Sequence, residues 1–177
     1  NLARTLNETN QPIEAQSEFQ IQARLGPNVA DTHWNLGSNL RERGKFDQAI
    51  AEFNRALAID PTLAQVHYAR GLAYLAQGKS NSAEADFQQA VDLKPDYAVA
   101  HNALGELLVK RHNFARAIEE YHRAILSDAS YAQPHLNLAA VLNAMGDHAA
   151  AQVEFERAVA IDPSLAQYKQ HVLGQSP

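Results

Sequence analysis

The chain has 177 residues, of which 20% are charged, with a formal net charge of −5 and no cysteine. This mildly acidic balance lacks the basic excess typical of nucleic-acid binding, and the lack of cysteine excludes disulfides and thiolate chemistry. No apolar run approaches the roughly 18 residues of a membrane-spanning helix. We therefore expect neither nucleic-acid binding nor membrane insertion.

Residues 1–29 contain the later part of a helical repeat. Ala15 and, four residues on, Phe19 form a pair that recurs along the chain, and Pro27 follows. Because Asn1 falls inside this repeat, we expect the sequence to be a piece of a longer protein or a processed product.

Residues 30–63 contain two amphipathic helical patterns. Spacings of three and four residues mark one face of a helix. The first face carries His33, Leu36, Gly37 and Leu40, and the second carries Phe46, Ala49, Ile50, Phe53, Ala56 and Leu57. Gly44 lies between them, where a left-handed turn is least costly. Small residues at Gly37 and Ala49 would let the helices approach closely, with Phe53 filling the remaining space.

The same pattern returns every 34 residues without an insertion. Three series carry it: Ala15, Ala49, Ala83, Ala117 and Ala151; Phe19, Phe53, Phe87, Tyr121 and Phe155; and Ala3, Gly37, Gly71, Gly105 and Ala139. A period of this length is typical of solenoids. We assign a partial repeat to 1–29, full repeats to 30–63, 64–97, 98–131 and 132–165, a closing helix to 166–173 and a tail to 174–177. Residues 1–173 are predicted to form a single domain.

Each repeat is expected to end at a helix stop that is followed by a capped restart. Proline inside a helix costs about 3 kcal/mol, so Pro61 should end the second helix. Thr62 would then cap the next helix, and Gln65 would complete a capping box. The same arrangement recurs as Ser130 with Gln133 and Ser164 with Gln167. At the turn inside a repeat, His112 replaces glycine, and histidine is among the residues that tolerate a left-handed conformation.

A 34-residue helix pair with these positions resembles the tetratricopeptide repeat. The best copy carries the resemblance at Leu36, Gly37, Leu40, Gly44, Ala49, Phe53, Ala56 and Pro61. The departures are Gln22, Arg70, His112 and Ala129. The resemblance implies an all-α fold, a right-handed α-solenoid of stacked antiparallel helix pairs that share one apolar spine.

In that family the first helices line a concave groove that takes an extended peptide or a partner helix. The resemblance places these groove residues here: Trp34, Asn35, Ser38, Arg41, Tyr68, Leu72, Asn102, Glu106, Asn137 and Asn143. Arg4 and Asn7 would extend this surface. Trp34 and Tyr68 occupy equivalent positions and are candidate aromatic anchors. The alternative is that Trp34 packs against the next repeat and has no ligand.

Two subfamilies suggest different partners. One uses lysine, arginine and asparagine to hold a chaperone's terminal carboxylate. The corresponding positions here lack a basic residue: Trp34, Ser38, Ala69, Val99 and Ala103. The phrases AHNALGELLVK and PHLNLAAVLNAMGD instead resemble the repeats of O-linked N-acetylglucosamine transferase, whose groove asparagines hold protein substrates. Asn35 and Asn137 match that position, whereas Ala69 and Ala103 interrupt it.

Some residues suggest chemistry. A period-34 series resembles a metal ladder: His33, His67, His101 and His135. Stacked equivalents lie about 8–10 Å apart, too far to share one zinc, so we interpret these histidines as packing groups. We interpret Glu119-Glu120 as solvated or capping groups. Asn7-Glu8-Thr9 fits an N-glycosylation acceptor, a pattern of low specificity. Without a recognisable catalytic motif, we predict no enzymatic activity, metal or cofactor in these residues.

Three functions remain open. The main prediction is a non-catalytic scaffold that binds a protein or peptide partner in the groove. The first alternative is the substrate-recruiting arm of a larger enzyme such as a glycosyltransferase. The second is self-assembly into a homo-oligomer through the solenoid ends, since the repeat that contains Asn1 starts part-way and would leave an uncapped end.

Overall fold

The computed structural model describes residue 17 and residues 30–174, and every regular element in this part of the chain is helical. Apart from Ser17, the partial repeat predicted at 1–29 lies outside the described residues, as do the groove candidates Arg4 and Asn7 and the glycosylation motif. The chain divides into two compact units, the first ending at Leu93 and the second beginning at Lys94. The assignment of 1–173 to one domain stays a prediction.

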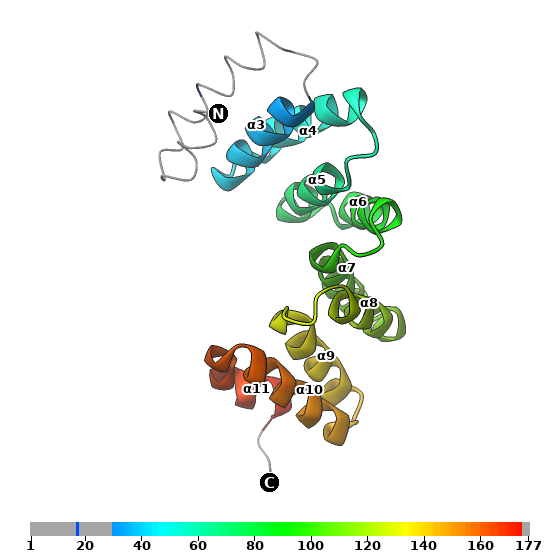
Figure 1. Ribbon diagram of the computed structural model, residues 1–177, viewed down its shortest axis with the longest axis vertical. Helices are drawn as coiled ribbons and strands as arrows, with labels where there is room; N and C mark the ends of the chain where they lie inside the picture. Colours follow the sequence, from blue (N-terminus) through cyan, green and yellow to red (C-terminus); the bar gives the residue numbers. More distant parts are fainter. Residues whose placement is uncertain (1–16, 18–29, 175–177) are drawn as a thin grey trace. The chain divides into compact units, whose positions relative to one another are not determined.

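Both units consist of helix pairs (Figure 1). Unit 1 contains α3 (Ala30–Glu42), α4 (Phe46–Ile59), α5 (Ala64–Ala76) and α6 (Ser80–Leu93). Unit 2 contains α7 (Ala98–Lys110), α8 (Phe114–Ser127), α9 (Ala132–Ala144), α10 (His148–Ile161), the 3-10 helix η1 (Pro163–Tyr168) and α11 (Lys169–Leu173). The predicted all-α class of paired helices is confirmed. The closing segment differs in detail, because a 3-10 helix precedes the short α11.

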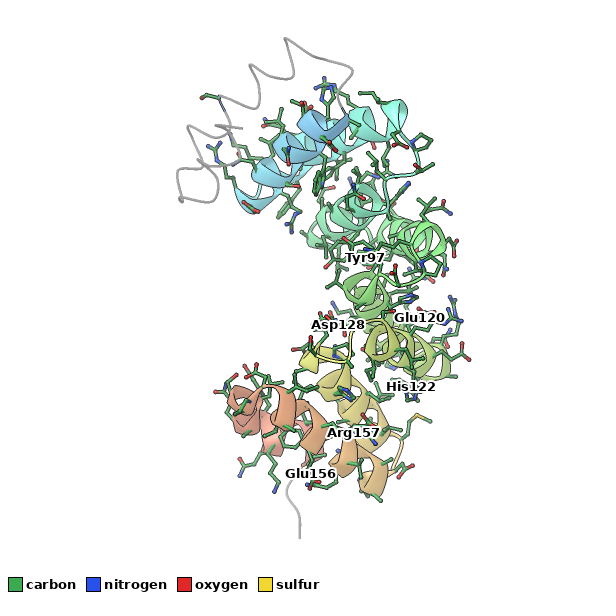
Figure 2. All side chains as sticks on the ribbon, viewed as in Figure 1. Tyr97, Glu120, His122, Asp128, Glu156 and Arg157 are labelled. Carbon is green, nitrogen blue, oxygen red and sulfur yellow. The ribbon has the colours of Figure 1, made fainter. Side chains whose placement is uncertain are left out.

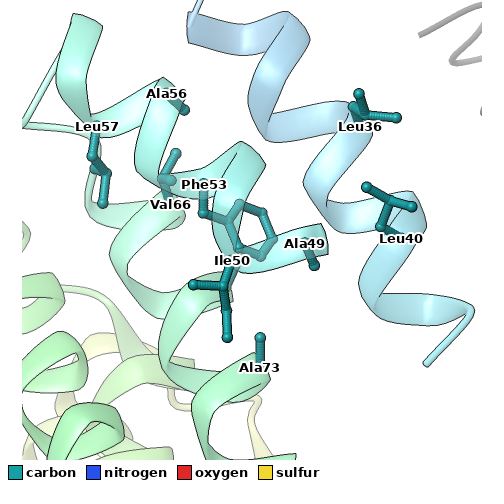
Figure 3. Close-up of a cluster of buried hydrophobic side chains, with 10 residues drawn as sticks. Leu36, Leu40, Ala49, Ile50, Phe53, Ala56, Leu57, Val66 and Ala73 are labelled. Carbon is teal, nitrogen blue, oxygen red and sulfur yellow. The ribbon is translucent and has the colours of Figure 1, made fainter. Parts of the chain in front are cut away.

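Within each pair, an aromatic ring of the second helix lies against a small residue of the first. Phe53 is completely buried, and a Cβ atom added to Gly37 would come within 2.6 Å of its ring. The same distance separates such an atom on Gly71 or Gly105 from the ring of Phe87 or Tyr121. Figure 3 shows Phe53 within the unit 1 core, which contains side chains of α3, α4 and α5. In these three pairs the missing side chain of glycine therefore lets the helices approach closely. In the α9–α10 pair alanine takes this place, and Ala139 and Phe155 belong to one core cluster.

The turns inside the pairs use left-handed residues, as predicted. Gly44, Gly78 and Gly146 have φ angles of 70°, 72° and 87°. His112 takes the equivalent place with φ 57°, and its ring meets Phe114 edge-on at 5.9 Å. Histidine thus replaces glycine without changing the turn.

The predicted capping boxes between the pairs are wrong. Leu63 and Tyr131 are the N-caps of α5 and α9, and neither makes a side-chain capping bond. Instead Asp60 accepts bonds from the Thr62 backbone nitrogen at 2.9 Å and from its hydroxyl at 2.7 Å. These hydrogen bonds, chiefly the one from the hydroxyl, lower the pKa of Asp60. Asp128 makes the same two bonds with Ser130. The aspartate stabilises the turn by a local bond that competes with capping.

The four period-34 histidines are buried and paired with carboxylates 19 positions further on. The Nδ1–oxygen distances are 2.7 Å for His33–Glu52, 3.2 Å for His67–Asp86, 2.6 Å for His101–Glu120 and 2.6 Å for His135–Glu154. Each bond joins the two helices of one pair, which supports the packing interpretation. In the described range, no group of three or more potential ligands could hold a metal ion.

The interpretation of Glu120 as a solvated or capping group is wrong. This residue, marked on α8 in Figure 2, is only 3% exposed and bonds His101. His101 also bonds the Pro95 carbonyl through Nε2 at 3.0 Å, as His67 bonds Pro61. Because a carbonyl oxygen only accepts, Nε2 of each ring carries a proton. These two histidines therefore join their helix pair to the loop that precedes it.

Each of the four buried carboxylates pairs with an arginine. In three helix pairs the arginine lies on the same helix as the carboxylate, and in one it lies on the other helix. Arg55, Arg123 and Arg157, each three residues after the glutamate, pair with Glu52, Glu120 and Glu154. In α6 that position is Gln89. There Arg70 of α5 binds both Asp86 oxygens, Nε at 2.8 Å and Nη2 at 2.7 Å. The departure at Arg70 from the family pattern thus supplies the missing cation.

The contact with Arg70 changes the pKa of Asp86. Burial raises its pKa, but the hydrogen bonds from Arg70 and His67 outweigh burial and hold the pKa below its ordinary value. Arg70 also donates to Asn54 of α4 at 2.6 Å. One side chain therefore links α4, α5 and α6.

Ala83→Leu should destabilise unit 1. Ala83 is completely buried in α6, and enlarging a packed side chain costs about 1–3 kcal/mol. The measurement is the urea midpoint, with Ala85→Leu at an exposed position of α6 as the matched control. An unchanged midpoint for Ala83→Leu would contradict the close helix contact.

Arg70→Leu should cost about 1–3 kcal/mol of unfolding free energy, because it leaves the buried Asp86 carboxylate without its cation. Adding Gln89→Arg should recover at least half of that loss, since arginine pairs with the carboxylate from this position in the other three pairs. Gln88→Arg adds the same charge on a different side of α6 and should recover little. Equal recovery by both arginines would show a general charge effect instead.

Candidate functional site

In unit 2, the first helices of neighbouring pairs carry a connected row of polar side chains. Asn102 Nδ2 of α7 donates to Glu106 Oε1 at 2.8 Å. Asn137 Nδ2 of α9 donates to Asn102 Oδ1 at 3.0 Å and to Glu106 Oε1 at 3.1 Å. Gln133 donates to Asn137 Oδ1 at 3.0 Å. The structure thus brings together three predicted groove residues, which we call the amide row: Asn102, Glu106 and Asn137.

A pocket of about 290 Å³ lies beside the amide row. Glu106 and Val109 of α7, Tyr121 of α8, and Ala140 and Val141 of α9 are among its lining residues. Most of this lining is apolar, with Glu106 at an exposed position. The site therefore combines a hollow for an apolar group with hydrogen-bonding side chains next to it.

Tyr121 gives the pocket a polar atom that the other pairs lack. Its counterparts Phe53, Phe87 and Phe155 have no hydroxyl. The Tyr121 side chain is 2% exposed, and burial, together with the charge of Glu106, raises its pKa above the ordinary value. A tyrosine hydroxyl is protonated at neutral pH even at its ordinary pKa, so this one can donate a hydrogen bond.

Tyr121 was not predicted as a site residue because its position belongs to the core series. The available signal was the chemical difference within that series, in which one tyrosine stands among phenylalanines. Lys110 and Phe114, which also line the pocket, were missed because they lie at the turn end of α7 and the start of α8.

The two predicted aromatic anchors have packing contacts in unit 1. Trp34 packs against the core cluster, and the Tyr68 ring lies 5.9 Å from the ring of Phe87. Removing both would therefore be expected to lower stability, so their substitution does not separate binding from folding. Their role as anchors stays a prediction.

The remaining candidates are dispersed. Asn35, Ser38 and Arg41 lie half-buried along α3, and Leu72 lies half-buried on α5. Asn143, near the end of α9, accepts a 2.7 Å hydrogen bond from Nδ1 of His148. The described contacts do not join these residues to the amide row.

Solved structures with the same fold include three named proteins. MamA 41-end from Desulfovibrio magneticus RS-1 is 21% identical, with a TM-score of 0.80 and 93% of each chain covered. YrrB, described as a TPR protein with an unusual peptide-binding site, is 18% identical, with a TM-score of 0.74 and 96% of this chain and 88% of YrrB covered. PilF of Pseudomonas aeruginosa is 18% identical, with a TM-score of 0.82 and 98% of this chain and 84% of PilF covered. At these identities the likeness shows the fold alone.

No curated protein sequence matches the chain. The part of the chain that the structure describes contains no helix with the length and apolar character needed to cross a bilayer.

Family models give the decisive comparison. The model described as TPR repeat matches residues 37–78, and the model described as tetratricopeptide repeat matches residues 68–125 and 102–166. These matches overlap and together cover residues 37–166, which lie in both units. The chain therefore belongs to the tetratricopeptide repeat family.

Proposed function

We propose that the chain is a non-catalytic interaction scaffold, and that unit 2 binds an extended peptide of a partner protein along the amide row. Members of the family are in general scaffolds of this kind, and YrrB is described as having a peptide-binding site. The observation that carries the proposal is the hydrogen-bonded row Asn102, Glu106 and Asn137 beside an apolar pocket.

The amide row can bond a peptide backbone through its oxygens. Both Nδ2 hydrogens of Asn137 are engaged within the row, but its Oδ1 accepts only the bond from Gln133 and has a second lone pair for a peptide N–H. Asn102 is buried and Asn137 is half-buried, so their mutual bonds hold them in one orientation before a ligand arrives. Groups that are already ordered lose less conformational entropy on binding. The row would thus contribute sequence-tolerant contacts, and the pocket would contribute selectivity.

The narrower functions stay predictions. None of MamA, YrrB and PilF is named as a glycosyltransferase, so these neighbours give no support to the resemblance to O-linked N-acetylglucosamine transferase or to a substrate-recruiting arm. Self-assembly through the solenoid ends is likewise a prediction that a measurement of mass can decide.

Asn137→Ala should weaken partner binding by about 3- to 10-fold, the equivalent of one net hydrogen bond. The purified chain would capture its partner from a cell extract, mass spectrometry would identify it, and titration with the responsible peptide would give Kd. Gln89→Ala, an exposed amide on α6, is the control. Unchanged affinity in Asn137→Ala, with its melting temperature intact, would contradict the proposed role of the amide row.

If the chain assembles through its solenoid ends, the mass measured by light scattering should rise as the protein concentration is raised. A mass that stays at 19.5 kDa over the whole series would remove this alternative.

A further inference from the structure

The unit 2 pocket contains two polar atoms without a hydrogen-bond partner in residues 30–174. Glu106 receives both of its amide bonds at Oε1, which leaves Oε2 free to accept. The Tyr121 hydroxyl has no hydrogen bond within the same range, although the side chain is 2% exposed and lines the pocket. The Tyr121 oxygen is not among the fully enclosed atoms that lack a partner, and Glu106 is exposed, so both atoms are open to a ligand in the pocket, and one hydroxyl group can bond both at once.

The size and charge of the pocket limit what that ligand can be. Small-molecule pockets usually occupy about 300–1,000 Å³, so a volume of about 290 Å³ suits one large side chain. Val109, Ala140 and Val141 require an apolar body. Lys110 lines the same pocket as Glu106, so the two opposite charges favour a neutral occupant over a cation or an anion.

We infer that this pocket binds a tyrosine side chain of the partner peptide, an inference that rests on the proposed function. The ring would pack against Val109 and Val141. Its hydroxyl would donate to Glu106 Oε2 and accept from the Tyr121 hydroxyl, which uses both free groups at once. Phenylalanine would leave both groups unpaired. Arginine cannot accept from Tyr121 and would face the charge of Lys110.

The test uses NMR of the full chain with three probes: N-acetyl-tyrosinamide, N-acetyl-phenylalaninamide and N-acetyl-argininamide. Amide shifts detect millimolar binding, so a single side chain is a sufficient probe. The tyrosine derivative should shift the amides of Val109 and Ala140. Its Kd should be about 5- to 10-fold lower than that of the phenylalanine derivative, the effect of one or two net hydrogen bonds.

Two variants should abolish that preference. Tyr121→Phe removes only the hydroxyl and introduces the residue that already stands at the equivalent positions Phe53, Phe87 and Phe155. Glu106→Gln removes the carboxylate. In each, the ratio of the two Kd values should fall towards one. Glu119→Gln, an equal charge change at an exposed position of α8 that does not line the pocket, should leave the ratio unchanged.

Each contrary outcome has a distinct meaning. Equal or tighter binding of the phenylalanine or arginine derivative at the pocket would overturn the tyrosine assignment and leave the peptide groove standing. If no derivative shifts the pocket amides, the pocket inference itself is overturned. The proposed function fails separately, when Asn137→Ala binds its captured partner as tightly as the original chain.

Discussion

The contact between an aromatic ring and a small residue determines how each helix pair is built. Phe53 lies close against α3 because Gly37 has no side chain, since a Cβ atom there would approach the ring to 2.6 Å. Close approach brings the facing sides of the two helices within hydrogen-bonding distance. The bond between His33 and Glu52 then joins them. A dense apolar contact thus places a polar pair whose burial would be costly without its partner.

The local parts of the fold could be predicted from sequence because they depend on short-range patterns. The helix faces follow from spacings of three and four residues, and the turn at His112 follows from backbone chemistry. The capping boxes failed because Asp60 and Thr62 can both bond nearby backbone groups, and the sequence does not show which forms the bond. The pairing of His101 with Glu120 depends on the register of two helices. Both series recur at period 34, so this signal was present in the sequence.

The candidate site was predicted only in part for a related reason. The family resemblance supplied Asn102, Glu106 and Asn137, but it describes positions and not their hydrogen bonds. The hydrogen bond from Asn137 of α9 to Asn102 of α7 depends on the tertiary structure. Arg70 is similar. In the sequence it is only a departure from a pattern, and its meaning appears when its contact with Asp86 is set beside the glutamine at Gln89. Compensation of this kind joins positions on different helices, so no local window contains it.

Tyr121 connects the stability of the scaffold with its surface. Its ring performs the packing role of Phe53, against Gly105, and the same residue lines the pocket. The core position holds the hydroxyl rigidly, because a ring trapped between two helices cannot turn its end away. A single oxygen atom added to a structural residue can therefore give one copy of a repeat a chemical property that the others lack, without changing the helices around it. Repeat proteins can in this way keep a uniform core and still differ from one pair to the next in what their surface recognises.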